Sequence, residues 1–211
     1  MDAGMTLGGG VYSSRLAARL ANITTRKLRY WGGQGLVRPS VFDAPRGGQD
    51  LYSYTDLVQI RAVAELRRQG ASLQKVRKAI EWLREQMADG EDWHTKTLRT
   101  DGRDVFAFVG PGDVYSAANQ PGQRVFDVVL GDLEQGLSDV GRELGIGTRV
   151  TIDPGVQGGT PVVRNTRLPT SFIDSLLRDG YLPEELVAQY PGLTIEDVRA
   201  AEAFERNIRA A

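Results

Sequence analysis

Two short helical segments within residues 13–35 constrain the fold of this chain more than any other feature. Ser13 or Ser14 is suited to cap the first, because a serine hydroxyl accepts a backbone N–H of the first turn. Thr24 is placed to cap the second, which ends at a run of glycines. Asn22 lies in the turn between them, and asparagine tolerates the left-handed conformation that a tight turn requires. Two short helices joined in this way predict a helix-turn-helix unit.

The segment that follows predicts a wing and two further helices. Residues 38–52 are rich in Pro and Gly and have apolar residues on both sides, which indicates a hairpin or loop. A third helix is expected to begin at a cap on Thr55 and to end at Gly70, and a fourth to follow a cap on Ser72. The fourth has apolar residues three and four apart: Leu73, Val76, Ile80, Leu83 and Met87. This narrow seam predicts packing within the same domain, with a seam between two copies of the chain as the alternative.

The rest of the chain predicts a β-containing middle and a second helical unit. Strands are expected at Val105–Val109, Val114–Tyr115 and 124–130, followed by a helix over 131–144 and a linker over 145–148. A ribbon of Val150–Ile152 and Pro161–Val163 then precedes three short helices, which begin at Thr170 or Ser171, at Pro183 and after Thr194. The predicted class is mainly α (α+β). The predicted domains are 11–88, a winged helix-turn-helix; 89–147, a hairpin and helix region; and 148–211, a small three-helix module with a ribbon.

Charge is distributed unevenly along a chain whose formal net charge is only −1. Residues 1–88 hold 14 basic and 7 acidic residues, residues 89–145 hold 5 and 11, and residues 146–211 hold 7 and 9. A basic segment favours a polyanionic partner, because neutralised phosphates release condensed counterions. The alternative is a solvated charged face without a partner.

Several kinds of chemistry find no support in the sequence. The chain has no cysteine, which excludes disulfides, thiol catalysis and zinc fingers. His94 is the only histidine, in an acidic segment that we interpret as solvated surface rather than a metal site. No phosphate-binding loop occurs, and no apolar run approaches the roughly 18 residues of a membrane helix. We therefore expect a cytoplasmic protein that is not an enzyme and has no cofactor, metal site or membrane partner.

The second helix of the helix-turn-helix unit has the residues of a DNA-recognition helix. Leu28 is its core anchor, and Arg26 and Arg29 lie on the opposite side, where arginine can pair with guanine in the major groove. Hydroxyl and lysine side chains around them are suited to phosphate contacts. The alternative is an ordinary basic helix with Tyr30 and Trp31 in the core. The predicted DNA contacts are Thr24, Thr25, Arg26, Lys27, Arg29, Tyr30 and Trp31, with Arg46 in the wing.

Residues 12–87 resemble the N-terminal domain of the MerR family of transcription regulators. The matching stretches are Ile23–Trp31, Gly35–Pro39, Leu51–Ser53 with Asp56-Leu57, and Leu66–Leu73. The resemblance implies a winged helix-turn-helix with Arg26 and Arg29 on DNA and Tyr30 near the backbone. Three departures stand out: Trp31 replaces a tyrosine, Gln49-Asp50 replaces a Tyr-Arg pair, and no long dimer helix follows Met87. A wing contact is then expected from Arg46, and the missing cysteines argue against metal sensing.

Residues 152–204 resemble a small helical domain of unknown function. The resemblance is carried by Gly159–Val163, Thr166–Pro169, Pro183–Leu186, Tyr190–Leu193 and Glu196–Ala201. This domain is similar to antitoxins of toxin–antitoxin operons, commonly beside a PIN-domain ribonuclease. The resemblance implies a VapB-type antitoxin that neutralises the toxin and represses its own operon. Arg206 and Arg209 are candidates, by charge, for blocking the acidic toxin site, and the alternative is a solvated helix end.

The predicted partners are double-stranded operator DNA, a PIN-domain toxin and a second copy of the chain in a homo-oligomer. The alternative function is a MerR-like transcription regulator whose middle region binds a small-molecule effector. A third hypothesis has both helical domains on DNA.

Overall fold

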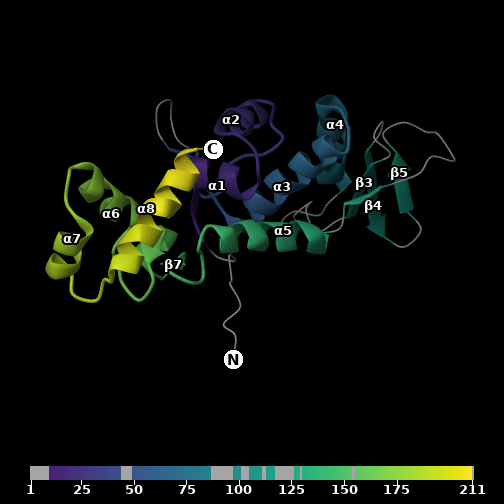
Figure 1. Ribbon diagram of the computed structural model, residues 1–211. Coiled ribbons are helices and arrows are strands. Elements are labelled where there is room, and N and C mark those ends of the chain that lie inside the picture. The colour runs from purple at the N-terminus through teal and green to yellow at the C-terminus, as the bar shows by residue number, and fades with distance from the viewer. Residues whose placement is uncertain are drawn as a thin grey trace.

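The computed structural model describes residues 10–43, 49–86, 97–100, 105–110, 113–116, 126–128, 130–153 and 155–210. It is mainly helical with small antiparallel sheets, which confirms the predicted α+β class (Figure 1). Among the described helices, none combines the length and apolarity that crossing a bilayer requires. We call residues 10–86 the head and residues 150–210 the module.

The predicted helix-turn-helix unit is present. α1 (Ser14–Leu20) is capped by Ser13, whose hydroxyl accepts the Leu16 N–H, and α2 (Thr25–Gly33) is capped by Thr24, whose hydroxyl accepts the Lys27 N–H. Asn22, in the turn, has a φ of 55°, the left-handed conformation expected of it. Both caps and the turn are therefore confirmed.

A small ribbon and two longer helices complete the head. β1 (Tyr12–Ser13) pairs antiparallel with β2 (Leu51–Tyr52), with Tyr12 opposite Tyr52. α3 (Tyr54–Arg68) begins at Ser53 and not at Thr55 as predicted, because Ser53 and Asp56 form a reciprocal capping box that places Thr55 inside the first turn.

α4 (Leu73–Gln86) follows the predicted cap on Ser72. In α4, Val76 and Ile80 are fully buried within the head, which favours intradomain packing of that part of the seam.

The middle region forms a four-stranded antiparallel sheet and a helix. Its strands are β3 (Thr97–Thr100), β4 (Val105–Gly110), β5 (Asp113–Ser116) and β6 (Phe126–Val128), in the order β5-β4-β3-β6. The predicted hairpin and third strand are confirmed, whereas β3 was not predicted. α5 (Leu130–Glu143) lies beneath α3 (Figure 1). The expected linker after it is a tight turn in which Ile146 is buried.

The module has the predicted ribbon and three helices. β7 (Val150–Thr151) and β8 (Val162–Val163) pair around a short 3-10 turn, η2 (Gln157–Gly159). α6 (Thr170–Arg178), α7 (Pro183–Gln189) and α8 (Ile195–Arg209) follow. Thr194 caps α8 as predicted, and it forms a reciprocal capping box with Asp197, the third residue of the helix. α6 begins at Thr170, one of the two predicted starts, and the Thr170 hydroxyl donates to Glu205.

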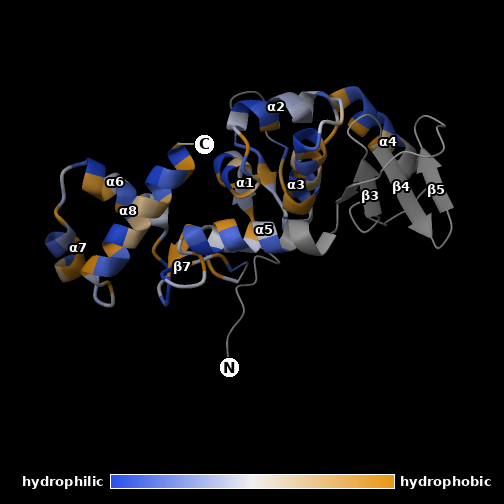
Figure 2. Cartoon of the chain, turned by 45° about the vertical axis from the view of Figure 1, so that its right-hand side comes forward, coloured by the Kyte–Doolittle hydropathy of each residue, from blue (hydrophilic) through white to orange (hydrophobic). Residues whose placement is uncertain are grey.

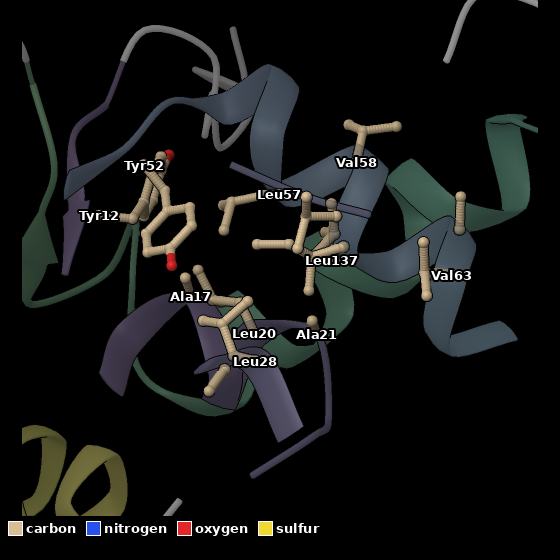
Figure 3. Packing of buried hydrophobic residues seen from close by; sticks show 14 of the residues in the cluster. Tyr12, Ala17, Leu20, Ala21, Leu28, Tyr52, Leu57, Val58, Val63 and Leu137 are labelled. Carbon is tan, nitrogen blue, oxygen red and sulfur yellow. The ribbon is translucent and has the colours of Figure 1, made fainter. Parts of the chain in front are cut away.

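Two apolar clusters hold the chain together, and α8 contributes to both. The first, which we call the head cluster, includes the head core, Leu137 of α5, Ile146, and Phe204 and Ile208 of α8. Figure 3 shows part of this cluster, with Leu137 beside Leu57 of α3. The second lies inside the module and consists of Val163, Ile173, Leu186, Leu193, Val198 and Ala201. Apolar and hydrophilic residues alternate along the described helices, as expected of helices with one buried face (Figure 2). The C-terminal part of α8 is thereby packed against the head.

Candidate nucleic-acid interface

α2 separates its residues into a buried side and a charged, exposed side. Leu28 and Trp31 are buried, at 1% and 5% exposure. Arg26, Arg29 and Tyr30 are exposed, and Tyr30 retains 57% of its accessible surface. Trp31, which was predicted to lie at the interface, thus supports the helix from behind, whereas Tyr30 is not a core aromatic.

The cations of α2 are available for a ligand. Within the described part of the chain, no ion pair engages Arg26, Lys27 or Arg29. Thr24 is exposed and its hydroxyl is used by the cap, while Thr25 is partly exposed on the first turn. This arrangement matches the chemistry of a major-groove reader, with arginines for base edges and neighbouring polar groups for phosphates.

A groove lies beside α2, between the head and the module. It encloses about 670 Å³ and is lined on the head side by Arg15, Thr25 and Arg29, and on the module side by Thr160, Ser171, Glu205 and Arg209. We call it the interdomain groove. The elements that form the interdomain groove are far apart in the sequence, so no local sequence pattern predicts this groove.

A second hollow, of about 360 Å³, lies at the helix-turn-helix turn. It is lined by Arg19, Asn22, Thr24 and Lys27 of the head together with Asn207 and Ala210 of the module. The end of α8 therefore borders the helix-turn-helix unit at both the hollow and the interdomain groove, close to α1 in Figure 1.

The two arginines predicted for a toxin site have different environments. Arg209 binds Asp174 through both terminal nitrogens, with Nη2 3.0 Å from Oδ1, and Asp174 is 4% exposed. Arg206 is exposed, and its Nη1 lies 3.9 Å from the Glu202 carboxylate. Arg209 is thus held within the module, whereas Arg206 is accessible to a partner.

Glu205 is the carboxylate of the interdomain groove. Its Oε1 accepts the Thr170 hydroxyl at 2.6 Å. Burial raises the pKa of Glu205 above its usual value of 4.5, and Asp174 adds to the rise; the Thr170 hydrogen bond, Arg209 and Arg15 oppose it. Because Arg15 belongs to the head, its influence on Glu205 is electrostatic coupling across the groove.

The wing is only partly described. Phe42 and Leu51 exchange backbone hydrogen bonds of 3.1 and 2.9 Å, whereas Arg46, the predicted wing contact, lies outside the described residues. At the base of the wing, burial and then the Asp50 charge raise the pKa of Tyr52 to about 12.

His94 also lies outside the described residues. Among the residues that are described, no group of three or more His, Asp and Glu side chains is arranged to hold a metal ion.

Of the module residues that line the interdomain groove, the sequence singled out only Arg209, and for a toxin site. Thr160, Ser171 and Arg209 are separated from α2 by more than a hundred residues, and only the packing of α8 on the head brings them close. The sequence contains one weak indication of this packing. Phe204 and Ile208 continue the apolar stripe of α8 beyond Ala201, the last residue of α8 in the module core.

Two family models match separate parts of the chain. Residues 12–82 match the MerR HTH family regulatory protein, and residues 150–204 match a protein of unknown function, DUF433. The uncharacterized HTH-type transcriptional regulators Rv1830 of Mycobacterium tuberculosis and Mb1861 of Mycobacterium bovis are each 33% identical to this chain over 130 residues. The match covers 61% of this chain and 56% of each relative, so the chain spans about half the length of these curated relatives.

Two solved structures are also similar. The crystal structure of Rv2018 from Mycobacterium tuberculosis has a TM-score of 0.44 at 15% identity and covers 90% of this chain and 95% of that one. A DUF433 member from Anabaena variabilis is 35% identical, with a TM-score of 0.25 and coverage of 36% of this chain and 81% of that one.

Proposed function

We propose that this chain, which carries a MerR-type helix-turn-helix domain and a DUF433 domain, is a DNA-binding transcription regulator that acts as an antitoxin. In this function the head represses the chain's own operon, and the module binds and neutralises a PIN-domain ribonuclease. The observation that carries the DNA-binding part is the exposed cationic side of α2, centred on Arg26 and Arg29, which form no ion pair with another described residue.

An exposed apolar patch supports the protein-binding part. Phe172, Tyr181 and Leu182 of the module are 37%, 46% and 59% exposed. Tyr190 packs edge-on against Phe172, with ring centroids 5.9 Å apart, which fixes the orientation of the Phe172 ring. Exposed aromatic and aliphatic residues of this kind are typical of protein interfaces. Phe172 lies on α6, and Tyr181 and Leu182 lie in the connection between α6 and α7, which is at the end of the molecule away from α2 (Figure 1). A toxin bound at this connection leaves α2 free for DNA.

The second candidate function is a regulator that responds to a small-molecule effector. The volume of the interdomain groove favours it, because small-molecule sites have volumes of about 300–1,000 Å³. We rank it second, since such sites are lined mainly by apolar and aromatic side chains, whereas three arginines and several hydroxyl residues line this groove beside apolar residues such as Leu16 and Ile208.

The DNA-binding part is tested with Arg26→Ala in gel shifts on the DNA upstream of the gene. We expect a loss of about 1–3 kcal/mol and a relaxed base preference, because a base-reading arginine is removed. Arg178→Ala is the matched control, since Arg178 is exposed on α6 outside the interdomain groove. Equal affinities of the two variants would exclude Arg26 as a base reader.

The antitoxin part is tested by co-expression with the product of the neighbouring gene, followed by co-purification and a ribonuclease assay. Leu182→Asp is the informative variant: it places a charge in the apolar patch, yet aspartate at this N-cap of α7 favours the helix. We expect loss of the complex with no loss of thermal stability. Val41→Asp, at an apolar residue of the head that is also exposed, should leave the complex intact. A neighbour that is not toxic, or that forms no complex with the wild-type chain, contradicts the antitoxin function.

The proposal includes a homo-oligomer, because two-fold operators are read by two copies of a helix-turn-helix protein. Light scattering on the free and the DNA-bound chain tests it, and a single copy on the operator contradicts it.

A further inference from the structure

The interdomain groove has one wall from the recognition helix unit and one from the module. We propose that it receives one sugar-phosphate strand of the operator, so that the DUF433 module itself contacts DNA phosphates. The proposal rests on the DNA-binding function of the head and adds a second part of the chain to the interface.

The position of the groove follows from how a recognition helix docks. A helix in the major groove, which is about 12 Å wide, has one DNA backbone along each of its two sides. Thr25 and Arg29 of α2 line the interdomain groove, so the surface next to that side of the helix is shared by the head and the module. With α2 in the major groove, the backbone on this side must lie over residues of both, including Arg15 on α1 and Ser171 on α6.

The chemistry of the walls suits phosphate. The charged residues that line the groove are three arginines and one carboxylate, namely Arg15, Arg29, Arg209 and Glu205. Arginine, serine and threonine are common donors to phosphate oxygens. Asp174 holds the two terminal nitrogens of Arg209, which fixes the guanidinium plane and leaves further N–H donors of its five for a ligand.

The single carboxylate does not cancel this attraction. Glu205 is partly buried, its Oε1 accepts the Thr170 hydroxyl at 2.6 Å, and the charges of Arg15 and Arg209 act on it from the two walls. With Asp174, the partner of Arg209, also counted, three arginines face two carboxylates, so the interdomain groove keeps an excess of one positive charge toward a phosphate. Its volume of about 670 Å³ admits a strand of backbone but not a whole duplex, which agrees with a groove that flanks the DNA.

The module wall is held at a fixed distance from the head. Phe204 and Ile208 of α8 are buried in the head cluster. Gly159 has a φ of +82°, and a Cβ on it would lie 2.8 Å from the backbone nitrogen of Val11, so only glycine permits this approach. Thr160 follows directly, and its exposed side chain is thereby presented at the groove.

Charge substitutions at Thr160 test the proposal at an exposed position whose side chain forms no hydrogen bond among the described residues. Operator affinity of the full chain is measured by fluorescence anisotropy over a series of KCl concentrations. For Thr160→Lys we expect tighter binding and a salt slope steeper by about 0.9, the value for one added phosphate contact. For Thr160→Glu we expect binding severalfold weaker than that of the wild type.

Gln189→Lys and Gln189→Glu are the matched controls. They make the same charge changes at an exposed position of α7, outside the interdomain groove, and should leave affinity and slope unchanged. If the Thr160 and Gln189 pairs behave alike, the proposal is wrong. If Arg26→Ala weakens operator binding but neither Thr160 variant changes it, only this inference fails. A wild-type chain that binds no operator contradicts the proposed DNA-binding function as well.

A second arm separates DNA phosphate from free phosphate. Thermal unfolding of the wild-type chain and both Thr160 variants is compared in inorganic phosphate and in chloride at equal ionic strength. Stabilisation by phosphate that depends on Thr160, combined with unchanged operator affinity of the variants, overturns the proposal, because the groove is then a site for a free anion. Operator affinity that depends on Thr160, whether or not phosphate stabilises the chain, supports the proposal.

Discussion

Truncation of Phe204 should separate the unfolding of the head from that of the module. Phe204 lies on α8, a helix of the module, but it is 1% exposed and packs in the head cluster. The Phe204→Ala substitution removes this side chain and leaves a cavity at the junction. The module cluster, which contains Val198 and Ala201 of the same helix, loses no member.

The expected cost is about 3–5 kcal/mol, the range for a buried Phe→Ala substitution. This is a large part of the roughly 5–15 kcal/mol by which most domains are stable. Phe172→Ala is the matched control: it makes the same substitution at a side chain that is 37% exposed and loses the edge-on contact with Tyr190. That contact is worth about 0.5–1.5 kcal/mol.

Urea unfolding followed by two probes measures the effect. The tryptophans of the chain are Trp31, Trp82 and Trp93, so none belongs to the module, whereas far-UV circular dichroism reports all helices. In Phe204→Ala we expect the tryptophan transition to occur at lower urea than the final circular-dichroism transition. Coincident transitions with a loss below about 1.5 kcal/mol, no larger than the control, would refute the role of Phe204 as the link between the cores.

Two other predictions concern the end of α8. Arg209→Ala leaves the buried Asp174 carboxylate without its arginine partner and should lower the free energy of unfolding by about 1–3 kcal/mol. Arg206→Ala, at an exposed ion pair, should change this free energy by less than about 0.5 kcal/mol. Equal losses of the two variants in thermal unfolding would contradict the distinction. Because burial raises the pKa of Glu205 in the folded state, its contribution to stability is fully present below the unfolded pKa of about 4.5 and is lost as the pH rises through the folded pKa. Glu205→Gln keeps an acceptor for the Thr170 hydroxyl but does not titrate. Over the same pH interval, the melting temperature of the variant should therefore rise relative to that of the wild type. A difference in melting temperature that does not change with pH would contradict the raised pKa of Glu205.

The parts of the fold that local chemistry determines were predictable. Ser13, Thr24, Ser72 and Thr194 cap helices through hydrogen bonds that span only three residues, so the sequence contains the whole interaction. Thr55 was a wrong choice for the same reason. A competing Ser-x-x-Asp pair two residues earlier satisfies more backbone donors than a lone threonine does.

The parts that depend on distant contacts were not predictable. β3 is a short strand of mixed polarity, and its pairing with β4 and β6 defines it more than its own pattern does. The interdomain groove depends on the packing of Phe204 and Ile208 against the head. In α2 the sequence predicted the exposed arginines, but it placed both Tyr30 and Trp31 at the DNA, with both in the core as the alternative, whereas only Trp31 is buried.

The packing of α8 on the head also has a consequence for biosynthesis. The apolar surface formed by Leu16, Leu20 and the rest of the head cluster emerges from the ribosome long before Phe204 and Ile208 are translated. Until then the nascent head lacks part of its core, and contacts so distant in sequence form slowly. An mRNA truncated within the module-coding part would therefore yield a head with exposed apolar surface, which chaperones and proteases bind. The order of translation in this way delays a fully packed head until the module that completes its core has been made.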